Sequence, residues 1–398
     1  MSYLLEKSEV LVENVQTSFF RGLYSSINWK NRLIGIKGAR GTGKTTLLLQ
    51  RLKELGKSPS EAMYVSLDDL YFSNKSLIEI ITSFYKQGGR IVFLDEVHKY
   101  PDWAKHIKNS YDYFADLQIA FTGSSIIDIA REEADLSRRV RMYELPGLSY
   151  REYLAFAHGI QMDVIELNDL LSPKNQWKSK LPTSFKPLQH FQSYLSGGYY
   201  PFFKEDEEGF HDRVKQMIRM IVEYDMAELH DFDIRNAKKM LQLLYILSVN
   251  VPFKPNISSL AEKSQIHRNS IINYLHFLEQ AKLIKLLYST GISVSVLQKP
   301  EKIYLENTNL AYALSEGIPD KGNLRETFFM DQLSINHKVS QHKNADFIVD
   351  DKWVIEIGGK NKGTKQIENL KNAYRVLDDV DFTLAEKSIP LWTFGFLY

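Results

Sequence analysis

The sequence contains no cysteine among its 398 residues. This absence excludes disulfide bonds, thiolate metal sites and a thiol nucleophile. An excess of charge is also missing, because 50 Lys and Arg residues stand against 49 Asp and Glu residues and give a formal net charge of +1. The total charge therefore predicts no polyanionic partner, and any such signal must be regional.

Long hydrophobic runs are missing as well. The longest apolar stretch, residues 241–253, is interrupted by polar residues and a proline. The N-terminal segment carries Glu6, Lys7 and Glu9 where a signal peptide needs an apolar core. We therefore expect no membrane partner, and together with the missing cysteine this favours a cytoplasmic location.

The composition is that of a globular protein, with 44% hydrophobic and 25% charged residues. A chain of this length is expected to fold as about two to four domains. Between residues 32 and 153, short β-rich runs alternate with helical stretches, which predicts an α/β fold with a parallel sheet. These runs read RLIGIK, AMYVSL, RIVFLD, LQIAFTGS and RMYEL.

Domain boundaries are predicted where this alternation of β-rich and helical runs changes. Residues 158–187 contain several prolines among polar residues, and the spacing of the apolar residues is then that of a helix up to about residue 250. We predict a first domain over residues 1–157, a connection and helical subdomain over 158–250, a third module over 251–302 and a mixed α/β domain over 303–398.

A phosphate-binding motif follows the first of the β-rich runs. Residues 38–45 read GARGTGKT, which fits the P-loop pattern of two glycines four residues apart followed by Lys and a hydroxyl. Glycines let backbone N–H groups turn toward phosphate oxygens, and the helix N-terminus adds its positive end. Lys44 is expected to contact the β- and γ-phosphates of ATP, and Thr45 to be a Mg²⁺ ligand. The expected nucleotide-binding residues are Gly38, Ala39, Arg40, Gly41, Thr42, Gly43, Lys44, Thr45 and Thr46. The alternative is a glycine-rich turn that merely enters a helix.

A second motif favours the nucleotide site. Residues 91–96, IVFLDE, form an apolar run that ends in two acids, as in a Walker B motif. Asp95 is expected to hold Mg²⁺ through water, and Glu96 to polarise the attacking water. We expect this strand to neighbour the P-loop strand in the sheet.

Polar residues after the next β-rich run are candidates for the same site. The run 117–121 ends in Thr122 and Ser124, and a polar residue there would point at the γ-phosphate, although Ser124 also suits a helix cap. We predict Ser124 as the sensor, with Thr122 as the other candidate. Arg139 is predicted to neutralise transition-state charge, in its own subunit or a neighbour's, the alternative being a solvated basic turn.

Three stretches of sequence, residues 94–103 (LDEVHKYPDW), 121–125 (FTGSS) and 145–153 (LPGLSYREY), are similar to a large bacterial and archaeal family of AAA-type ATPases with a C-terminal domain of unknown function. The phrases GGYYP at 197–201 and YLHFLE at 274–279 extend the resemblance over nearly the whole chain. The resemblance implies an AAA/ASCE-type P-loop ATPase joined to a winged-helix domain and a restriction-endonuclease-like domain.

The third module reads as helix, turn, helix and a hairpin over residues 283–298, which predicts a winged helix. Nine basic and three acidic side chains between residues 238 and 302 give an excess of +6, which favours DNA as a partner. The residues expected to face a DNA groove are His267, Arg268, Asn269 and Asn273. The alternative is a rigid packing module with solvated lysines.

The last domain resembles a PD-(D/E)XK nuclease, with Glu326 on a helix and Asp346 and Glu356 on a hairpin. That chemistry needs two carboxylates on one metal ion and a lysine near the attacking water. A three-residue turn would put Asp346 opposite Glu356, whereas a two-residue turn would not. The lysine position two residues after Glu356 is Gly358, and Lys360 lies about 13 Å further along an extended strand than Glu356. We therefore expect a degenerate domain without nuclease activity.

The sequence as a whole predicts an ATP- and Mg²⁺-dependent ATPase whose nucleotide state acts on a DNA-binding winged helix. A nucleotide-gated switch with little turnover and an ATP-regulated nuclease are the alternatives. Self-association or a protein partner is left open, because an arginine that acts in trans cannot be distinguished from one that acts in cis.

Overall fold

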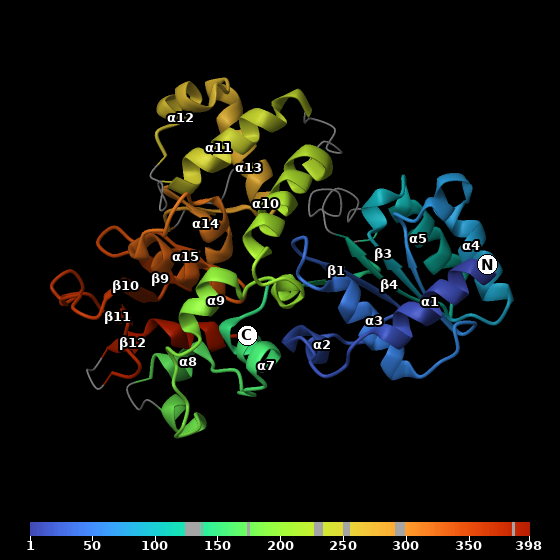
Figure 1. Ribbon diagram of the computed structural model, residues 1–398, viewed down its shortest axis with the longest axis horizontal. Helices are drawn as coiled ribbons and strands as arrows, with labels where there is room; N and C mark the ends of the chain where they lie inside the picture. Colours follow the sequence, from blue (N-terminus) through green and yellow to red (C-terminus); the bar gives the residue numbers. More distant parts are fainter. Residues whose placement is uncertain are drawn as a thin grey trace. The chain divides into compact units, whose positions relative to one another are not determined.

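The computed structural model describes residues 1–123, 136, 138–172, 176–226, 234–249, 255–290, 299–383 and 387–398. They form two compact units, Met1–Gly147 and Leu148–Tyr398 (Figure 1). The first unit ends before the boundary that we expected after residue 157. Within the described ranges, no helix combines the length and the apolar character that crossing a bilayer requires.

The first unit is built on a parallel sheet with the strand order β2-β3-β4-β1-β5. Its strands are β1 (Leu33–Lys37), β2 (Ala62–Ser66), β3 (Ile91–Asp95), β4 (Gln118–Gly123) and β5 (Arg141–Glu144). The predicted α/β fold with a parallel sheet is confirmed. The expectation that the Walker B strand neighbours the P-loop strand is wrong, because β4 lies between β1 and β3.

Helices cover both faces of this sheet because side chains alternate along each strand. Val92 and Leu94 of β3 belong to the same buried cluster as the inner faces of α4 and α5. Ile91 and Phe93 belong to the cluster that contains the leucines of α3. The helices are α1 (Ser2–Asn14), α2 (Gly22–Ser26), α3 (Lys44–Leu55), α4 (Leu77–Lys86) and α5 (Trp103–Tyr113), with short 3-10 helices η1 (Leu70–Asn74) and η2 (Val97–Lys99).

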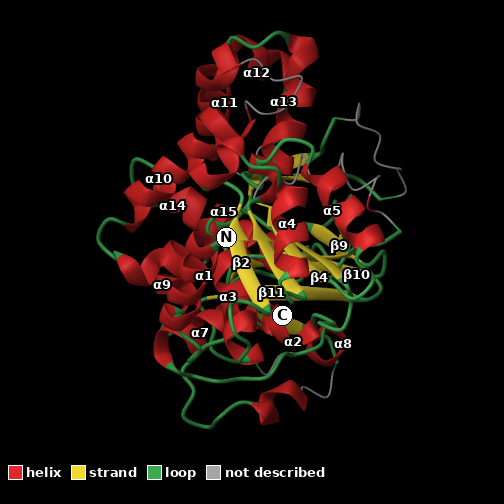
Figure 2. Cartoon of the chain, turned by 90° about the vertical axis from the view of Figure 1, so that its right-hand side faces the viewer, coloured by secondary structure: helices red, strands yellow, loops and turns green. Residues whose placement is uncertain are grey.

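Helix α1 packs on the edge strand β2, and Figure 2 shows the N-terminus beside this strand. The Ser8 Oγ accepts a 2.9 Å hydrogen bond from the Tyr64 backbone N–H, and Ser8 is only 2% exposed. A covered edge presents fewer unpaired backbone groups to other chains. The helix therefore protects the side of the sheet that is farthest from β5 in the strand order.

The second unit contains the three modules that we separated in the sequence. Its helices are α7 (Tyr150–His158), α8 (Leu167–Leu170), α9 (Phe191–Gly197), α10 (Phe210–Met220), α11 (Ala237–Val249), α12 (Ile257–Ser264), α13 (Arg268–Gln280), α14 (Thr308–Leu314) and α15 (Lys321–Leu333). Short helical turns are η3 (Gln176–Lys180), η4 (Pro201–Glu205), η7 (Ile234–Asn236), η8 (Leu391–Phe396) and the π-helical turn η5 (Ile221–Asp225), which continues α10. Contacts of α14 with α9, α10 and α15 join the modules into one unit.

Helices α11, α12 and α13 pack in sequence and lead into the antiparallel pair β6 (Ile284–Leu287) and β7 (Lys302–Leu305). We expected both strands of this hairpin within residues 283–298. Among the described residues, β6 pairs instead with β7, which begins only at Lys302. Residues 291–298 lie outside the described residues. The predicted boundary after residue 302 therefore falls inside β7.

A five-stranded mixed sheet with the order β12-β11-β10-β9-β8 forms the last part of the second unit. Its strands are β8 (Val339–Ser340), β9 (Phe347–Val349), β10 (Trp353–Gly359), β11 (Ala373–Asp378) and β12 (Ser388–Pro390). Trp353 pairs with Val349 across a three-residue turn, and Ile355 pairs with Phe347. This register puts Asp346 opposite Glu356, as in the first of the two turns that we considered.

Candidate functional site

The P-loop connects β1 to α3, which begins at Lys44. Gly41 and Gly43 have φ angles of 79° and 93°, in the left-handed region that glycine adopts without strain. Gly38 has no room for a side chain, since a Cβ there would lie 2.3 Å from the Leu145 carbonyl oxygen. The glycines thus allow the backbone conformation that the loop adopts.

Two basic side chains, Lys44 and Arg21, donate hydrogen bonds to the carbonyl groups of this loop. The Lys44 Nζ donates 2.9 Å hydrogen bonds to the carbonyls of Gly38 and Ala39, and Lys44 is 5% exposed. Arg21 donates from Nη1 to the Thr42 carbonyl at 2.7 Å, and from Nη2 to the carbonyls of residues 146 and 147 at 2.7 and 2.8 Å. Arg21 therefore ties the loop to the segment after β5.

Asp95, at the end of β3, collects hydroxyl groups from three other elements. Its Oδ2 accepts from Thr45 Oγ1 at 2.6 Å and from Tyr64 Oη at 2.7 Å, and its Oδ1 accepts from Thr122 Oγ1. Burial, followed by the charge of Asp95, raises the pKa of Tyr64 well above its ordinary value. Tyr64 is therefore a neutral donor, and Asp95 is held next to the start of α3.

Glu96 follows in a strained conformation, with φ at 51°. Its backbone N–H donates to Thr122 Oγ1 at 3.2 Å, and its carboxylate is partly exposed. The Nε2 of His98 lies 3.4 Å from Glu96 Oε2, and the His98 side chain is fully buried. The carboxylate of Glu96 is thus held between a distorted backbone and a buried ring.

Burial lowers the pKa of His98 to about 3, and the charges of Lys99, Lys44 and Arg40 act in the same direction. An unfolded histidine has a pKa of about 6.5. As the pH falls below 6.5, the unfolded chain binds a proton that the native chain refuses, so native stability decreases from pH 6.5 toward pH 3. His98→Asn should reduce the stability lost between pH 7 and pH 4.5 by about 2 to 3 kcal/mol, measured by denaturant unfolding. The exposed His267→Asn serves as the control, and an equal acid loss in both variants would contradict this assignment.

The four other predicted residues of this site have different positions. Thr122 lies at Asp95, Thr46 is exposed, and Ser124 lies outside the described residues. Arg139 precedes the amino end of β5, where Arg141 pairs with Ile34, whereas the P-loop follows the carboxyl end of β1. Its guanidinium makes 2.8 and 2.9 Å hydrogen bonds with Asp112 at the end of α5. Arg139 therefore does not lie at the P-loop of its own chain. It lies at the end of the sheet where the strands begin, and the P-loop lies where they end.

The chemistry of this edge fits a magnesium ion. Mg²⁺ prefers oxygen ligands and is usually bound by one or two protein groups together with waters and substrate phosphates. The hydroxyl of Thr45 and the carboxylate of Asp95 are such ligands and lie 2.6 Å apart. Over the described part of the chain, no three His, Asp or Glu side chains are grouped as a complete metal site. Mg²⁺ at this edge would therefore depend on bound phosphates.

The residues predicted to face DNA are exposed together at the start of α13: His267, Arg268, Asn269 and Asn273. The Nδ1 of His267 caps this helix by accepting from the Asn269 N–H at 3.3 Å. The basic excess of this module is smaller than we expected, because two of its lysines are buried in ion pairs. Lys285 lies 3.0 Å from Glu306, and Lys302 lies 3.0 Å from Glu326. Without these two lysines the excess falls from +6 to +4.

The nuclease-like residues are partly brought together. Asp346 Oδ2 accepts a 2.8 Å hydrogen bond from the N–H of Ile357, next to Glu356. Glu326 on α15 lies on the same side, since Lys302 Nζ is 3.0 Å from Glu326 and 3.9 Å from Asp346. Lys360 is exposed.

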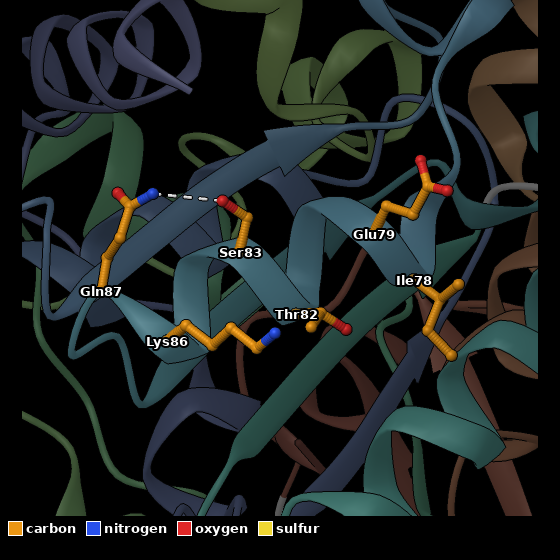
Figure 3. A pocket seen from close by; sticks show the side chains of 6 residues that line it. All are labelled: Ile78, Glu79, Thr82, Ser83, Lys86 and Gln87. Atoms are coloured by element: carbon orange, nitrogen blue, oxygen red, sulfur yellow. Dashed lines mark hydrogen bonds between the residues drawn. The ribbon is translucent and has the colours of Figure 1, made fainter.

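A surface depression of about 480 Å³ lies on α4, away from these motifs (Figure 3). Its lining comes from α4 and from Gln87, the residue after this helix, whose Nε2 donates to Ser83 Oγ at 3.1 Å. It contains none of the predicted site residues, so we assign it no role.

Three residues of the candidate site were missed in the sequence: Arg21, Tyr64 and His98. Arg21 belongs to no pattern, and Tyr64 was identified only as part of the β-rich run AMYVSL. His98 follows the two acids by only two residues, so its position beside Glu96 was the one available signal.

Comparisons with known proteins agree with this geometry. Residues 30–154 match the family model of an AAA domain, and residues 188–321 match a domain of unknown function (DUF8612). The first match includes both the P-loop and the Walker B strand. The chain therefore contains an AAA-type P-loop NTPase domain. The second match has no functional description, so the winged helix and the nuclease-like domain stay predictions.

Similar proteins include an archaeal relative and two solved structures. The chain is 29% identical to the uncharacterised protein MJ1637 of Methanocaldococcus jannaschii, over 88% of this chain and 80% of that protein. The Walker-type ATPase PABY2304 of Pyrococcus abyssi is 14% identical, with a TM-score of 0.46 over 76% of this chain and 99% of that one. AMPPCP-bound DnaA from Aquifex aeolicus is 16% identical, with a TM-score of 0.25 over 69% of this chain and 87% of that one.

Proposed function

We propose that the first unit binds ATP and hydrolyses it to ADP and phosphate. The observation that carries this proposal is the 2.6 Å hydrogen bond between Thr45 and Asp95. It joins the start of the P-loop helix to the end of the Walker B strand, with Glu96 as the next residue. A phosphate group, a metal ligand and a water-activating carboxylate are expected to meet at one edge of the sheet in such an arrangement.

The hydrolysis follows from the positions of these groups. The oxygen of a water molecule attacks the γ-phosphorus, and the bond to the β,γ-bridging oxygen breaks. The carboxylate of Glu96 accepts the proton of this water, and the ammonium of Lys44 stabilises the charge of the β- and γ-phosphates. Mg²⁺, held by Thr45 and Asp95, would neutralise further phosphate charge. Calorimetric titration of ATP and Mg²⁺, followed by a phosphate-release assay, tests binding and turnover separately.

A nucleotide-gated switch is the second candidate, and the position of Arg139 favours it. An arginine that stabilises the transition state contributes about 10³ to 10⁵ in rate, so hydrolysis by a single copy is expected to be slow if Arg139 is the arginine that the reaction uses. Turnover that rises with protein concentration would indicate an arginine from a second copy. Tight ATP binding with negligible turnover at every concentration would favour the switch.

We also propose that residues 237–305 act as a winged helix that binds DNA. The order of α11, α12, α13 and the β6–β7 pair supports this, as do the exposed polar residues at the start of α13. A helix that presents Arg and Asn side chains can contact both phosphates and base edges. ATP occupancy of the first unit is expected to change the affinity for DNA.

Arg268→Ala should weaken DNA binding and lower the salt dependence of log K by about one unit of slope, because one phosphate contact is lost. Fluorescence anisotropy of a labelled duplex between low and moderate salt measures both quantities. Gln280→Ala, at the exposed far end of the same helix, is the matched control and should leave both unchanged. A binding constant that is insensitive to salt would reject the DNA interface.

A further inference from the structure

Helix α15 carries a buried acid in the second unit that none of the sites above uses. Asp331 is 2% exposed, and Gln332 beside it is 1% exposed. The Gln332 Nε2 donates a 2.8 Å hydrogen bond to Asp331 Oδ2. In the part of the chain that the structure describes, this is the one hydrogen bond that the Asp331 carboxyl group makes. An ionised carboxylate would therefore be poorly compensated for its lost hydration.

The two remaining oxygens of these side chains are acceptors without donors. Asp331 Oδ1 and Gln332 Oε1 are both buried and have no hydrogen-bond partner among the described residues. Unpaired polar atoms of this kind are costly and require an explanation. One proton on Oδ1 removes both defects, because it neutralises the carboxylate and makes Oδ1 a donor for the amide oxygen.

The charges around Asp331 do not neutralise it. Lys285 and Glu306 form a buried ion pair with 3.0 Å between Nζ and Oε1, so their charges cancel. An ionised Asp331 would leave one uncompensated negative charge inside the unit. Burial raises the pKa of Asp331 to about 7, the charge of Lys285 opposes this shift, and the charge of Glu306 adds to it. The other titratable groups that face this site are Lys282, Tyr194, Tyr199, Tyr200 and Tyr398.

Gln332 also connects α15 to two other segments of the second unit. Its Nε2 lies 3.0 Å from the hydroxyl oxygen of Tyr194 on α9 and 3.3 Å from that of Tyr398. The Tyr194 hydroxyl in turn donates to the Leu148 carbonyl at 2.7 Å. The position of this one amide therefore affects how α15 is held to α9 and to both limits of the unit, residues 148 and 398.

We propose that Asp331 and Gln332 bind one proton between them and act as a pH-dependent lock that holds α15 to α9. With the proton bound, Oδ1 donates to the amide oxygen while Nε2 donates to Oδ2, so the amide is fixed from both sides. With the proton lost, Oδ1 and Oε1 are two acceptors without a donor, and the buried charge loosens the contacts of Gln332. The lock needs no nucleotide and goes beyond the ATPase proposed for the first unit.

The direction of the pH effect follows from proton binding. The pKa of an aspartate in the unfolded chain is about 3.9, below the value of about 7 in the native chain. Between these values the native chain binds more protons than the unfolded chain, so native stability falls as the pH rises. Relative to Asp331→Asn, the folding equilibrium constant of the parent chain should fall about tenfold per pH unit between about pH 4.5 and 6.5, and stay level above about pH 7.5. Pulsed hydrogen exchange of α15 at increasing denaturant measures this constant in the full chain.

Infrared difference spectroscopy of the full chain tests the proton itself. The carbonyl band of a protonated carboxyl group should be present at about pH 5.5, disappear by about pH 8.5, and be missing from Asp331→Asn at both values. Asp163→Asn makes the same change at an exposed position of the second unit and is the matched control, which should keep the band. Native hydrogen exchange of α9, corrected for its intrinsic pH dependence, should be at least about tenfold faster at the higher pH in the parent chain and equal at both in Asp331→Asn.

Each result supports or overturns the lock. A parent chain that shows the same bands as Asp331→Asn at about pH 5.5 overturns the bound proton, and stability that then depends on K⁺ or Na⁺ would assign the two oxygens to a metal cation instead. A band that titrates without any change in the exchange of α9 overturns the lock. If Asp331→Asn does not fold, Asp331→Ser, which is smaller and equally uncharged, replaces it in every comparison.

Discussion

Glu96→Gln is expected to lower ATP turnover by about 10²- to 10³-fold while ATP affinity stays within about threefold of the parent chain. The amide keeps the size of the side chain and its place beside His98, but it cannot accept the proton of the attacking water. The carboxylate is held by a left-handed backbone and by a buried neutral ring, so no other acid is expected to replace it. Phosphate release under saturating ATP measures turnover, and calorimetry measures affinity.

A control for this substitution is available on α4. Glu79→Gln makes the same chemical change at an exposed position and should leave turnover unchanged. Equal turnover in the two variants would show that Glu96 is not the base. Loss of both binding and turnover in Glu96→Gln would indicate a structural role instead.

Lys44→Ala is expected to weaken ATP binding by tenfold or more, about 1.4 kcal/mol, and to abolish measurable turnover. The ammonium is buried in a loop that is otherwise lined by backbone groups, so its charge is poorly screened by water. It also holds the carbonyls of Gly38 and Ala39, and the alanine variant leaves both without this donor. Lys44→Arg is not expected to restore binding, because the guanidinium is larger and planar.

Lys86→Ala, an exposed lysine at the end of α4, is the matched control for the lost charge. Its ATP affinity should equal that of the parent chain. Calorimetry with and without Mg²⁺ separates the contribution of the ammonium from that of the metal. Unchanged affinity in Lys44→Ala would remove the P-loop from the proposed site.

Much of the first unit could be predicted from the sequence, because its signals are local. Each β-rich run that we identified is a strand, and Lys44 donates to the carbonyls of Gly38 and Ala39 in the same motif. The order of the strands could not be predicted in detail. An inserted strand such as β4 depends on which helix faces pack on the sheet, and neighbouring runs in the sequence do not contain that information.

Long-range contacts explain what was missed elsewhere. Lys285 and Lys302 counted as solvated charges because their partners, Glu306 and Glu326, lie outside the window in which charges were summed. The 2.5 Å ion pair between Lys362 and Glu356 was missed because an extended strand was expected after Glu356. The chain reverses after Gly359, and the side chain of Lys362 fills the space that a side chain at position 358 would occupy.

Tyr64 has a consequence beyond the nucleotide site. Its hydroxyl donates to Asp95, while its own backbone N–H donates to Ser8 on the N-terminal helix. One residue thus separates the proposed metal ligand from a helix that lies on the outer edge of the sheet. A charged ligand that arrives at or leaves Asp95 would change the hydrogen bond of the Tyr64 hydroxyl, and the backbone N–H of the same residue is bonded to α1. The position of this helix is therefore expected to respond to occupancy of the site.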